Sequence, residues 1–444
     1  MTSISENVDD RLSRLPEEIL SHILSLMPMK FAVQTSILSK RWRYIWMFVT
    51  NLDFGEIHTM DSLHSLTIIV DRILKFCTPS QVKLFRLRFP VICARVSRVS
   101  NWIDEAVRLK ISELDLQVHQ LQLPPSMFTC KTLTKLRLYP SYYDSQNVWE
   151  FQCPVNLPCL KTLDILVFSN PSVNAFKLIG GCPMLENLSL EVTWGADEKD
   201  YVFKIPTLKR LKLTWAKCAT RFHKVILNVP NLEYLFVGGV LCSSFVVEDV
   251  SSLVEACVSF FEIRFYHLWF ELINGINGVK SLSAVNTTHL IDFDIPFTSP
   301  LLIFPNMNRL ELKGFWHSGL IPQFLESSPE LKHLCIEIVV DSSCKKHEEY
   351  SWVEREVVPT CMLTKLTTIK SSMCEKWKCD PAFLKHLLWK CDLPVLKYML
   401  RNTEMLKSVT ITWENSSIEK ETLSCAMLLK LLPRASRYCE ISFH

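Results

Sequence analysis

Glycine is scarce in this chain, with only 10 copies among 444 residues. Loops that cradle phosphate groups depend on glycine, and the sequence contains neither a G-x-G-x-x-G nor a G-K-[ST] motif. The G-x-S-x-G motif of many hydrolases is missing too. These absences argue against a nucleotide-binding fold and against an enzyme, and nothing in the sequence calls for a cofactor.

Charge of one sign is not in excess. The chain has 49 basic and 46 acidic residues, spread along its length, for a formal net charge of +3. No basic tail or large positive field is therefore present to recruit nucleic acid. At 444 residues, 48% of them hydrophobic, the chain is folded over most of its length. We expect several domains or one elongated repeat array.

Long hydrophobic runs are also absent. The run "LFVGGVLCSSFVV" has 13 residues, fewer than the roughly 20 that span a bilayer. The first residues, "MTSISENVDDR", lack the basic and apolar regions of a signal peptide. We therefore expect a protein of the cytosol or nucleus with no membrane partner. Its 17 cysteines then act as small core residues, as at Cys182, Cys242 and Cys257.

Two short motifs begin like metal sites but lack their partners. "HEEYS" at His347 has no second histidine four residues on, and the pair Cys374 and Cys379 is followed by no Cys or His pair at zinc spacing. "KRWR" at Lys40 could touch nucleic acid, although such charges more often form the solvated side of a helix. No metal site is predicted.

Repeats dominate the middle of the chain. The pattern L-x-x-L-x-L or a close variant starts at eleven positions that lie 21 to 28 residues apart, within the roughly 20 to 29 of a leucine-rich repeat. The starts are Leu84, Ile111, Leu133, Leu160, Leu185, Leu208, Leu232, Leu253, Val279, Met307 and Leu331. A mixed fold with chance matches is the alternative, and eleven near-regular copies favour the repeat array.

Strand geometry assigns a direction to each repeat position. Alternate residues face opposite sides, so the fourth and sixth positions point into the stack and the third, fifth and seventh point outward. The outward residues, which form the predicted contact face, include Lys135, Arg137, Thr162, Asp164, Asn187, Glu191, Arg210, Lys212, Tyr234, Phe236, Arg309, Glu311, His333 and Glu337. Their mixed charge fits a protein partner better than a phosphate backbone. A merely solvated face is the alternative for any one residue.

The most basic outward strand is "LKRLKL", which carries Arg210 and Lys212. Tyr234 and Phe236 follow one repeat later. Charged residues beside aromatic anchors are common in interfaces, so these four residues are the predicted target-binding patch.

The stretch "LPEEILSHILSLMPMKFAVQTSILSKRWRYIW", residues 15–46, predicts three short helices. The first begins at Pro16 and ends before Pro28, with Ile19, Ile23 and Leu26 on one stripe and Leu20, Leu24 and Met27 on another. The second holds Phe31, Val33 and Ile37, and the third begins at Ser39 with Trp42, Ile45, Trp46 and Val49 on one face. About forty residues are near the lower limit of independent folding, so apolar residues on two sides indicate a surface completed by another chain. An N-terminal helical cap of the repeats is the alternative.

This stretch closely resembles the F-box of plant F-box proteins with leucine-rich repeats, over residues 9–52. The resemblance implies binding to the Skp-type adaptor of an SCF ubiquitin ligase, and through it to cullin and RING subunits. The implied contact residues are Leu15, Pro16, Ile19, Ile23, Val33, Leu38 and Trp42. Met27 departs from the leucine that is common there, at little cost because its volume is similar.

The C-terminal segments "YSWVEREVVPTCMLTKLTTI", "LPVLKYMLRNTEMLKSVTITW" and "LLKLLPRASRYCEISFH" resemble the FBD domain of one plant subfamily. Read on their own residues, Leu396, Met399 and Leu400 form a helix face, Val409 and Ile411 a strand, and Leu428, Leu429, Leu431 and Leu432 a second helix. This strand–helix alternation could close the end of the array.

The predicted architecture is therefore α/β. A disordered start (1–8) precedes a three-helix F-box (9–52), a horseshoe-shaped leucine-rich-repeat solenoid (53–349) and a closing α/β FBD cap (350–444). The predicted function is that of a non-catalytic substrate receptor of an SCF-type ubiquitin ligase, with an unknown protein target. A leucine-rich-repeat interaction scaffold outside any ligase is the alternative.

Overall fold

The computed structural model describes residues 12, 14–55, 63–77, 82–88, 96–117, 123–139, 153–167, 172–192, 200–216, 224–263, 266–286, 300–314, 320–339, 357–374, 393–413 and 433–443. The chain forms two compact units, Met1–Ala196 and Asp197–His444. The predicted disordered start (1–8), His347, Cys379 and the predicted helix of Leu428 to Leu432 lie outside the described residues.

The first unit begins with an N-terminal helical segment, residues 14–50. It contains α1 (Glu17–Leu24), α2 (Met29–Gln34) and the 3-10 helices η1 (Thr35–Ile37) and η2 (Trp42–Phe48). Pro16 and Pro28 precede α1 and α2, where the missing N–H of proline costs no helical hydrogen bond. Helical turns occur in the three predicted places, but the second place is divided between α2 and η1, and the third is a 3-10 helix that starts at Trp42 and not at Ser39.

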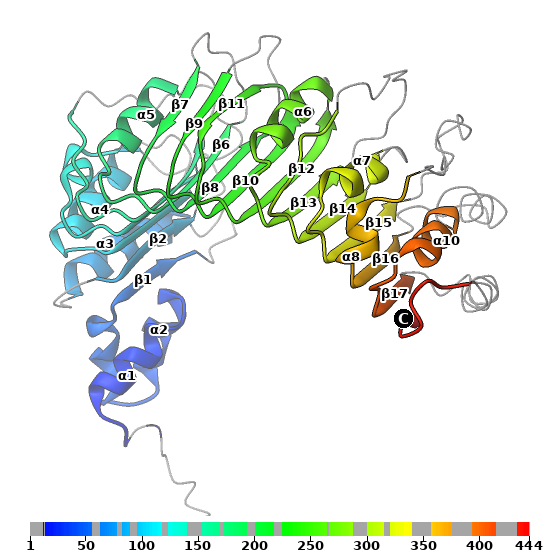
Figure 1. Ribbon diagram of the computed structural model, residues 1–444. Helices are drawn as coiled ribbons and strands as arrows, with labels where there is room; N and C mark the ends of the chain where they lie inside the picture. Colours follow the sequence, from blue (N-terminus) through cyan, green and yellow to red (C-terminus); the bar gives the residue numbers. More distant parts are fainter. Residues whose placement is uncertain are drawn as a thin grey trace, which may run out of the picture. The chain divides into compact units, whose positions relative to one another are not determined.

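The rest of the first unit is a parallel sheet with its strands in chain order (Figure 1). The strands are β1 (Asn51–Phe54), β2 (Leu84–Arg88), β3 (Glu113–Gln117), β4 (Lys135–Leu138), β5 (Thr162–Val167) and β6 (Asn187–Val192). The connections hold α3 (Leu63–Phe76), α4 (Val96–Arg108), η4 (Pro125–Thr129) and α5 (Ser172–Gly180).

The second unit also contains a sheet of parallel strands in chain order. They are β8 (Arg210–Trp215), β10 (Tyr234–Leu241), β12 (Glu255–Ile263), β13 (Ser281–Asn286), β14 (Arg309–Gly314), β15 (His333–Val339), β16 (Thr368–Cys374), β17 (Ser408–Trp413) and β18 (Glu440–Phe443). Its helices are α6 (Tyr266–Gly275), α7 (Leu320–Ser327), α8 (Thr360–Thr364) and α10 (Leu393–Asn402). A small parallel sheet of β7 (Tyr201–Lys204), β9 (Lys224–Asn228) and β11 (Ser244–Asp249) packs against α6 through β11.

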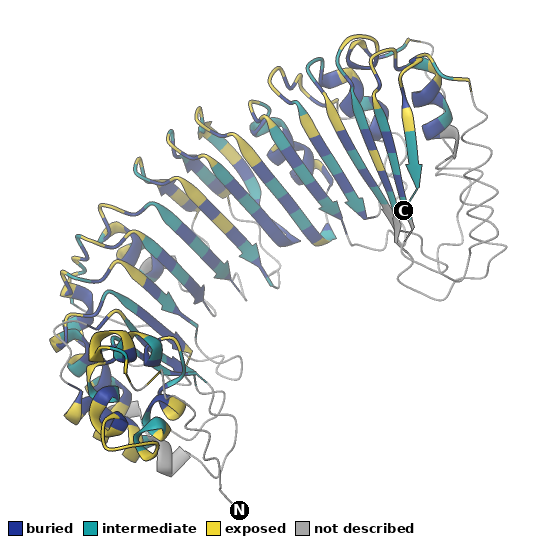
Figure 2. Ribbon diagram, turned by 90° about the horizontal axis from the view of Figure 1, so that it is seen from below, coloured by how far each residue is buried: buried dark blue, intermediate teal, exposed yellow. Residues whose placement is uncertain are grey.

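The predicted repeat register is confirmed at ten of the eleven starts. The fourth and sixth positions are buried, and the third and fifth are half-buried or exposed except at Asp115, which gives the strands an alternating band (Figure 2). Equivalent positions also pair across strands: Glu255 lies opposite Tyr234 on one side and Ser281 on the other. We call the side of each sheet that carries the third and fifth positions its open face.

The repeat predicted to start at Leu84 is corrected. Leu84 pairs with Glu113, a third-position residue, so this repeat starts two residues earlier, at Val82. Val82, Phe85 and Leu87 are fully buried there. A further repeat was missed altogether. Val49, Leu52 and Phe54 form the same buried pattern on β1, so the first repeat begins within the predicted F-box range.

A short turn precedes most repeat strands. In Leu185, for example, the backbone N–H donates to the carbonyl of Cys182, with Pro183 between them. The same bond recurs from Leu208 to Ile205 and from Met307 to Phe304. Proline has a fixed φ that suits the second position of such a turn. Where a proline precedes a repeat, it therefore favours the turn that leads into the strand.

The C-terminal segment continues the sheet of the second unit. His333 on β15 pairs with Thr368 on β16, Thr368 with Ser408, and Ser408 with Glu440 on β18. The first predicted helix and the strand after it are confirmed: Leu396, Met399 and Leu400 are buried on α10, and Val409 and Ile411 are buried on β17. Strands β16 to β18 thus extend the repeat sheet and form no separate layer, and closure of the array by this segment stays a prediction.

Gly239 on β10 lies where only glycine fits. Its φ is +95°, and an added Cβ would lie 1.9 Å from the carbonyl oxygen of Trp215 on β8. We expect Gly239→Ala to lower the free energy of unfolding by about 2 to 4 kcal/mol. Gly180, with no atom within 4 Å of an added Cβ, is the control, and Gly180→Ala should change it by less than about 1 kcal/mol. Urea denaturation of both variants checks this, and an equally small effect at Gly239 would contradict the close approach of its backbone to Trp215.

Candidate functional site

The N-terminal helical segment exposes apolar side chains on one side and buries them on the other. On α1, Leu20 and Leu24 are buried, whereas Ile19 is 46% exposed and Leu26, just after the helix, is 74% exposed. This confirms the two predicted stripes. The exposed apolar set in this segment is Ile19, Leu26, Phe31, Ile37, Leu38, Tyr44 and Phe48. So many exposed apolar residues in so short a segment mark a surface made for a partner.

Hydrogen bonds fix this segment on the first repeat. The backbone N–H of Thr50 donates to Oγ of Ser25 at 3.0 Å, and Nδ2 of Asn51 donates to the carbonyl of Ser25 at 2.9 Å. Within the segment, Arg41 donates to the carbonyl of Leu15. The segment that carries the apolar surface is therefore hydrogen-bonded to the first strand of the sheet and is not attached by a flexible linker alone.

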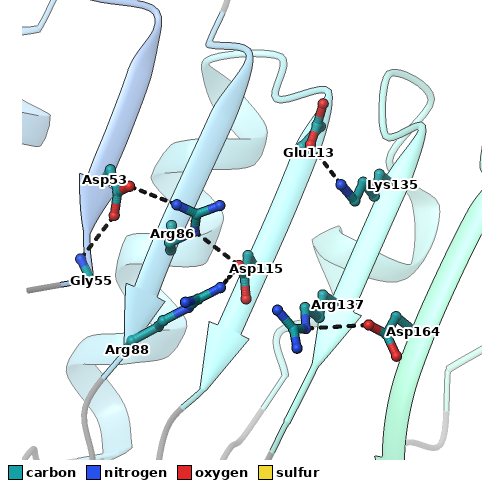
Figure 3. Close-up of polar contacts among 9 residues, drawn as sticks. All are labelled: Asp53, Gly55, Arg86, Arg88, Glu113, Asp115, Lys135, Arg137 and Asp164. Carbon is teal, nitrogen blue, oxygen red and sulfur yellow. Dashed lines mark hydrogen bonds and ion pairs between the residues drawn. The ribbon is translucent and has the colours of Figure 1, made fainter. Parts of the chain in front are cut away.

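The open face of the first unit carries a row of alternating charge (Figure 3). Asp53, Arg86, Asp115, Arg137 and Asp164 lie opposite one another on β1 to β5. Arg86 binds Asp53 at 2.7 Å and Asp115 at 2.9 Å, and Arg137 approaches Asp164 at 3.3 Å. Opposite charges directly across strands stabilise a sheet.

The same pairing extends beyond this row. Arg88 binds Asp115 at 2.7 Å, and Lys135 lies 3.5 Å from Glu113. Burial lowers the pKa of Arg86, but the carboxylates of Asp53 and Asp115 outweigh it, so the pKa is raised overall. The outward cations of β2 and β4 thus already have carboxylate partners, and this part of the predicted contact face holds its own strands together.

The open face of the second unit brings the four predicted target-binding residues together. Tyr234 lies opposite Arg210, and Phe236 opposite Lys212. The guanidinium carbon of Arg210 is 4.2 Å from the ring centre of Tyr234, and Nζ of Lys212 is 5.2 Å from that of Phe236. Both are cation–π contacts. We call these four residues the β8–β10 patch.

The cysteine prediction is confirmed at two positions and corrected at the third. Cys182 and Cys242 are buried, and burial raises the pKa of the Cys182 thiol to about 12. Cys257 instead lies on the open face, paired with Phe236 and Ser283 at the fifth position of its repeat. It is half-buried, so it is a surface neighbour of the β8–β10 patch and not a core residue.

Comparison with known proteins now decides the family. The F-box domain model matches residues 12–52, and a model described as the LRR repeats of FBD-associated F-box protein At5g56370 matches residues 99–199. F-box/LRR-repeat protein At4g14103 of Arabidopsis thaliana is 32% identical over 356 residues, which cover 73% of this chain and 91% of the relative. The chain belongs to the plant F-box/FBD/leucine-rich-repeat family.

Other relatives in this F-box family match almost end to end. FBD-associated F-box protein At4g10400 of Arabidopsis thaliana is 29% identical over 98% of this chain and 100% of its own length. F-box/FBD/LRR-repeat protein At1g78750, also of Arabidopsis thaliana, is 26% identical over 97% of this chain and 96% of its own. The N-terminal helical segment is accordingly the F-box, and the matched range begins three residues after the predicted one.

Within the F-box, six of the seven predicted adaptor contacts are at least partly exposed. Pro16, Ile19 and Leu38 are exposed, and Leu15, Ile23 and Val33 are half-buried. Trp42 is different. It is only 7% exposed and packs in the F-box core, and its predicted contact with the adaptor stays a prediction.

Sequence reasoning missed the most exposed apolar residue of the F-box. Ile37, the last residue of η1, is 85% exposed, compared with 66% for Leu38 and 46% for Ile19 among the predicted contact residues. Phe31, Tyr44 and Phe48 were missed as well. Phe31 and Ile37 had been assigned to the second predicted helix, but that assignment did not say which of its apolar residues stay exposed.

Two features are absent from the described part of the chain. In it, no three His, Cys, Asp or Glu side chains are close enough together to bind a metal ion. Among the same residues, no helix has the length and apolar character that a membrane crossing requires.

Proposed function

We propose that the chain is the substrate-recognition subunit of an SCF-type ubiquitin ligase. The F-box docks on a Skp-type adaptor, which connects it to cullin and RING subunits, and the repeats hold a protein target. The observation that carries this proposal is the exposed apolar set of the F-box, which leaves residues such as Leu26 and Ile37 in water. A partner surface that covers them removes apolar area from water at roughly 25 cal/mol per Å².

In the proposed role, the chain brings its target close to the ubiquitin-charged enzyme and does not itself catalyse a reaction. A target bound on the repeats is kept at high effective concentration near the ubiquitin-charged enzyme, which speeds transfer without any new contact at the reacting atoms. The hydrogen bonds from Thr50 and Asn51 to Ser25 support this role, because they hold the F-box in one position on the first repeat. We propose the cytosol or nucleus as the place of action.

Affinity capture from plant extract tests the proposal. The tagged chain should retrieve a Skp-type adaptor, and a variant with Leu26 and Ile37 both replaced by aspartate should not. Point variants are preferable to deletion of residues 9–52, because that deletion removes Val49 and Leu52 from the first repeat. Retrieval of other proteins but never an adaptor would favour the alternative, an interaction scaffold outside any ligase.

A further inference from the structure

The β8–β10 patch differs from the open face of the first unit in how its cations are paired. In the described residues of β2 and β4, the cations Arg86, Arg88, Lys135 and Arg137 each have a carboxylate partner. Among the described residues, Arg210 and Lys212 make contacts with aromatic rings and have no carboxylate within ion-pair distance. Their positive charge is therefore not neutralised within the sheet.

The nearest acid on the same row is Glu255 on β12. It lies opposite Tyr234, and Tyr234 lies opposite Arg210, so two strand spacings, about 10 Å, separate Glu255 from Arg210. Burial raises the pKa of Tyr234, which stays a neutral hydroxyl between them. Arg210 and Lys212 can thus attract an external anion without competition from a bonded partner.

The rings of Tyr234 and Phe236 position the side chains of Arg210 and Lys212 for an anionic ligand. A guanidinium group over a ring still has its in-plane N–H donors, which match the two oxygens of a carboxylate. The aromatic contact also limits the freedom of both long side chains, so less entropy is lost when they bind. Because the cations cover the two rings, the rings are poorly placed to stack with the bases of a nucleic acid.

Room for a chain lies beside the patch. Apart from Glu255, the neighbouring outward positions on β12 and β13 carry the small side chains of Cys257, Ser281 and Ser283. On β10, the ring of Phe236 itself lies against Gly238, where an added Cβ would be 2.7 Å from it. The low part of the open face is therefore at Cys257, Ser281 and Ser283, where the backbone of a bound segment can lie close to the sheet.

The spacing of the cations defines the ligand. Arg210 and Lys212 are two residues apart on one strand, which places their Cα atoms about 6.6 Å apart. An extended segment with acidic residues at alternate positions has the same spacing on one of its faces. We infer that the β8–β10 patch binds an extended acidic segment of the target protein, with Asp or Glu at alternate positions. This inference rests on the proposed function in that the segment belongs to the ligase target.

A random peptide library displayed against the immobilised full-length chain tests the inference. Peptides that the wild type enriches should carry Asp or Glu at alternate positions. A selected peptide should lose about tenfold in affinity when its acids become glutamine, as expected for lost charged hydrogen bonds. Enrichment without acidic residues, or no enrichment at all, would overturn the inference. So would tighter binding of the peptide when phosphoserine replaces its acids.

Two double variants locate the binding. Arg210→Glu with Lys212→Glu should reduce peptide binding by at least about tenfold. Lys135→Glu with Lys161→Glu makes the same change in net charge at exposed cations of the first unit and should leave it unchanged. Equal losses of peptide binding in both variants would mean that only the net charge of the chain matters. That result would refute the β8–β10 patch as the binding site. Adaptor binding is measured in parallel: if it persists while acidic peptides fail, the inference is wrong and the proposed function stands.

Discussion

Replacing Leu188 by alanine is expected to lower the free energy of unfolding by about 2 to 5 kcal/mol. Leu188 is 1% exposed and sits at the fourth position of its repeat, opposite Leu163 on β5. The neighbouring strands are fixed by the hydrogen-bond ladder, so they cannot move in to fill the cavity. The loss therefore combines lost burial with an unfilled void.

The adjacent Asn187 is the matched control for this change. It lies half-exposed on the open face, where Nδ2 donates a long hydrogen bond of 3.3 Å to Thr162. Asn187→Ala should cost less than about 1 kcal/mol. Thermal and urea denaturation followed by circular dichroism would compare the two variants. Equal, small losses would contradict the assigned register.

The triple replacement of Leu15, Pro16 and Ile19 by alanine is expected to weaken adaptor binding by at least about a hundredfold, close to 3 kcal/mol. Pro16 and Ile19 are exposed and Leu15 is half-buried, so their side chains can enter an interface without first leaving the F-box core. The carbonyl of Pro16 still accepts the N–H groups of Ile19 and Leu20 in the variant, so α1 is expected to remain. Calorimetric titration with a purified Skp-type adaptor measures the effect.

A control for this experiment removes exposed apolar side chains elsewhere. Ile68 and Ile69 on α3 and Val254 before β12 are each exposed to a similar degree. Their triple alanine variant should bind the adaptor as the wild type does, with melting curves recorded for both variants. If the F-box triple variant kept wild-type affinity, the surface would not be the adaptor site.

Most of the repeat architecture could be predicted because it depends on local pattern. Leucines at fixed spacing place each strand, and strand alternation then decides which side chains are buried. The error at Leu84 has a plain cause. "VKLFRL" from Val82 and "LFRLRF" from Leu84 both fit the repeat pattern, and only the pairing of Leu84 with Glu113 selects the first.

The remaining features depend on pairings or geometry that sequence pattern does not encode. The row from Asp53 to Asp164 joins residues from five repeats, so its ion pairs follow only once the register of every strand is known. The third helix of the F-box was predicted to begin at Ser39, with Trp42, Ile45, Trp46 and Val49 on one face, but it is a 3-10 helix that begins at Trp42. In a 3-10 helix, residues three apart share a face, so Trp42 and Ile45 turn into the core together.

Reconstituted ubiquitin transfer tests the central claim most directly. The full-length chain would be assembled with adaptor, cullin and RING subunits and supplied with ubiquitin, activating and conjugating enzymes, and the proteins that the chain retrieves from plant extract. The account predicts that at least one retrieved protein becomes ubiquitinated, and that transfer stops with the Leu15, Pro16 and Ile19 triple variant. Assembly of the chain into the complex with no transfer to any retrieved protein, or equal transfer with the triple variant, would contradict it.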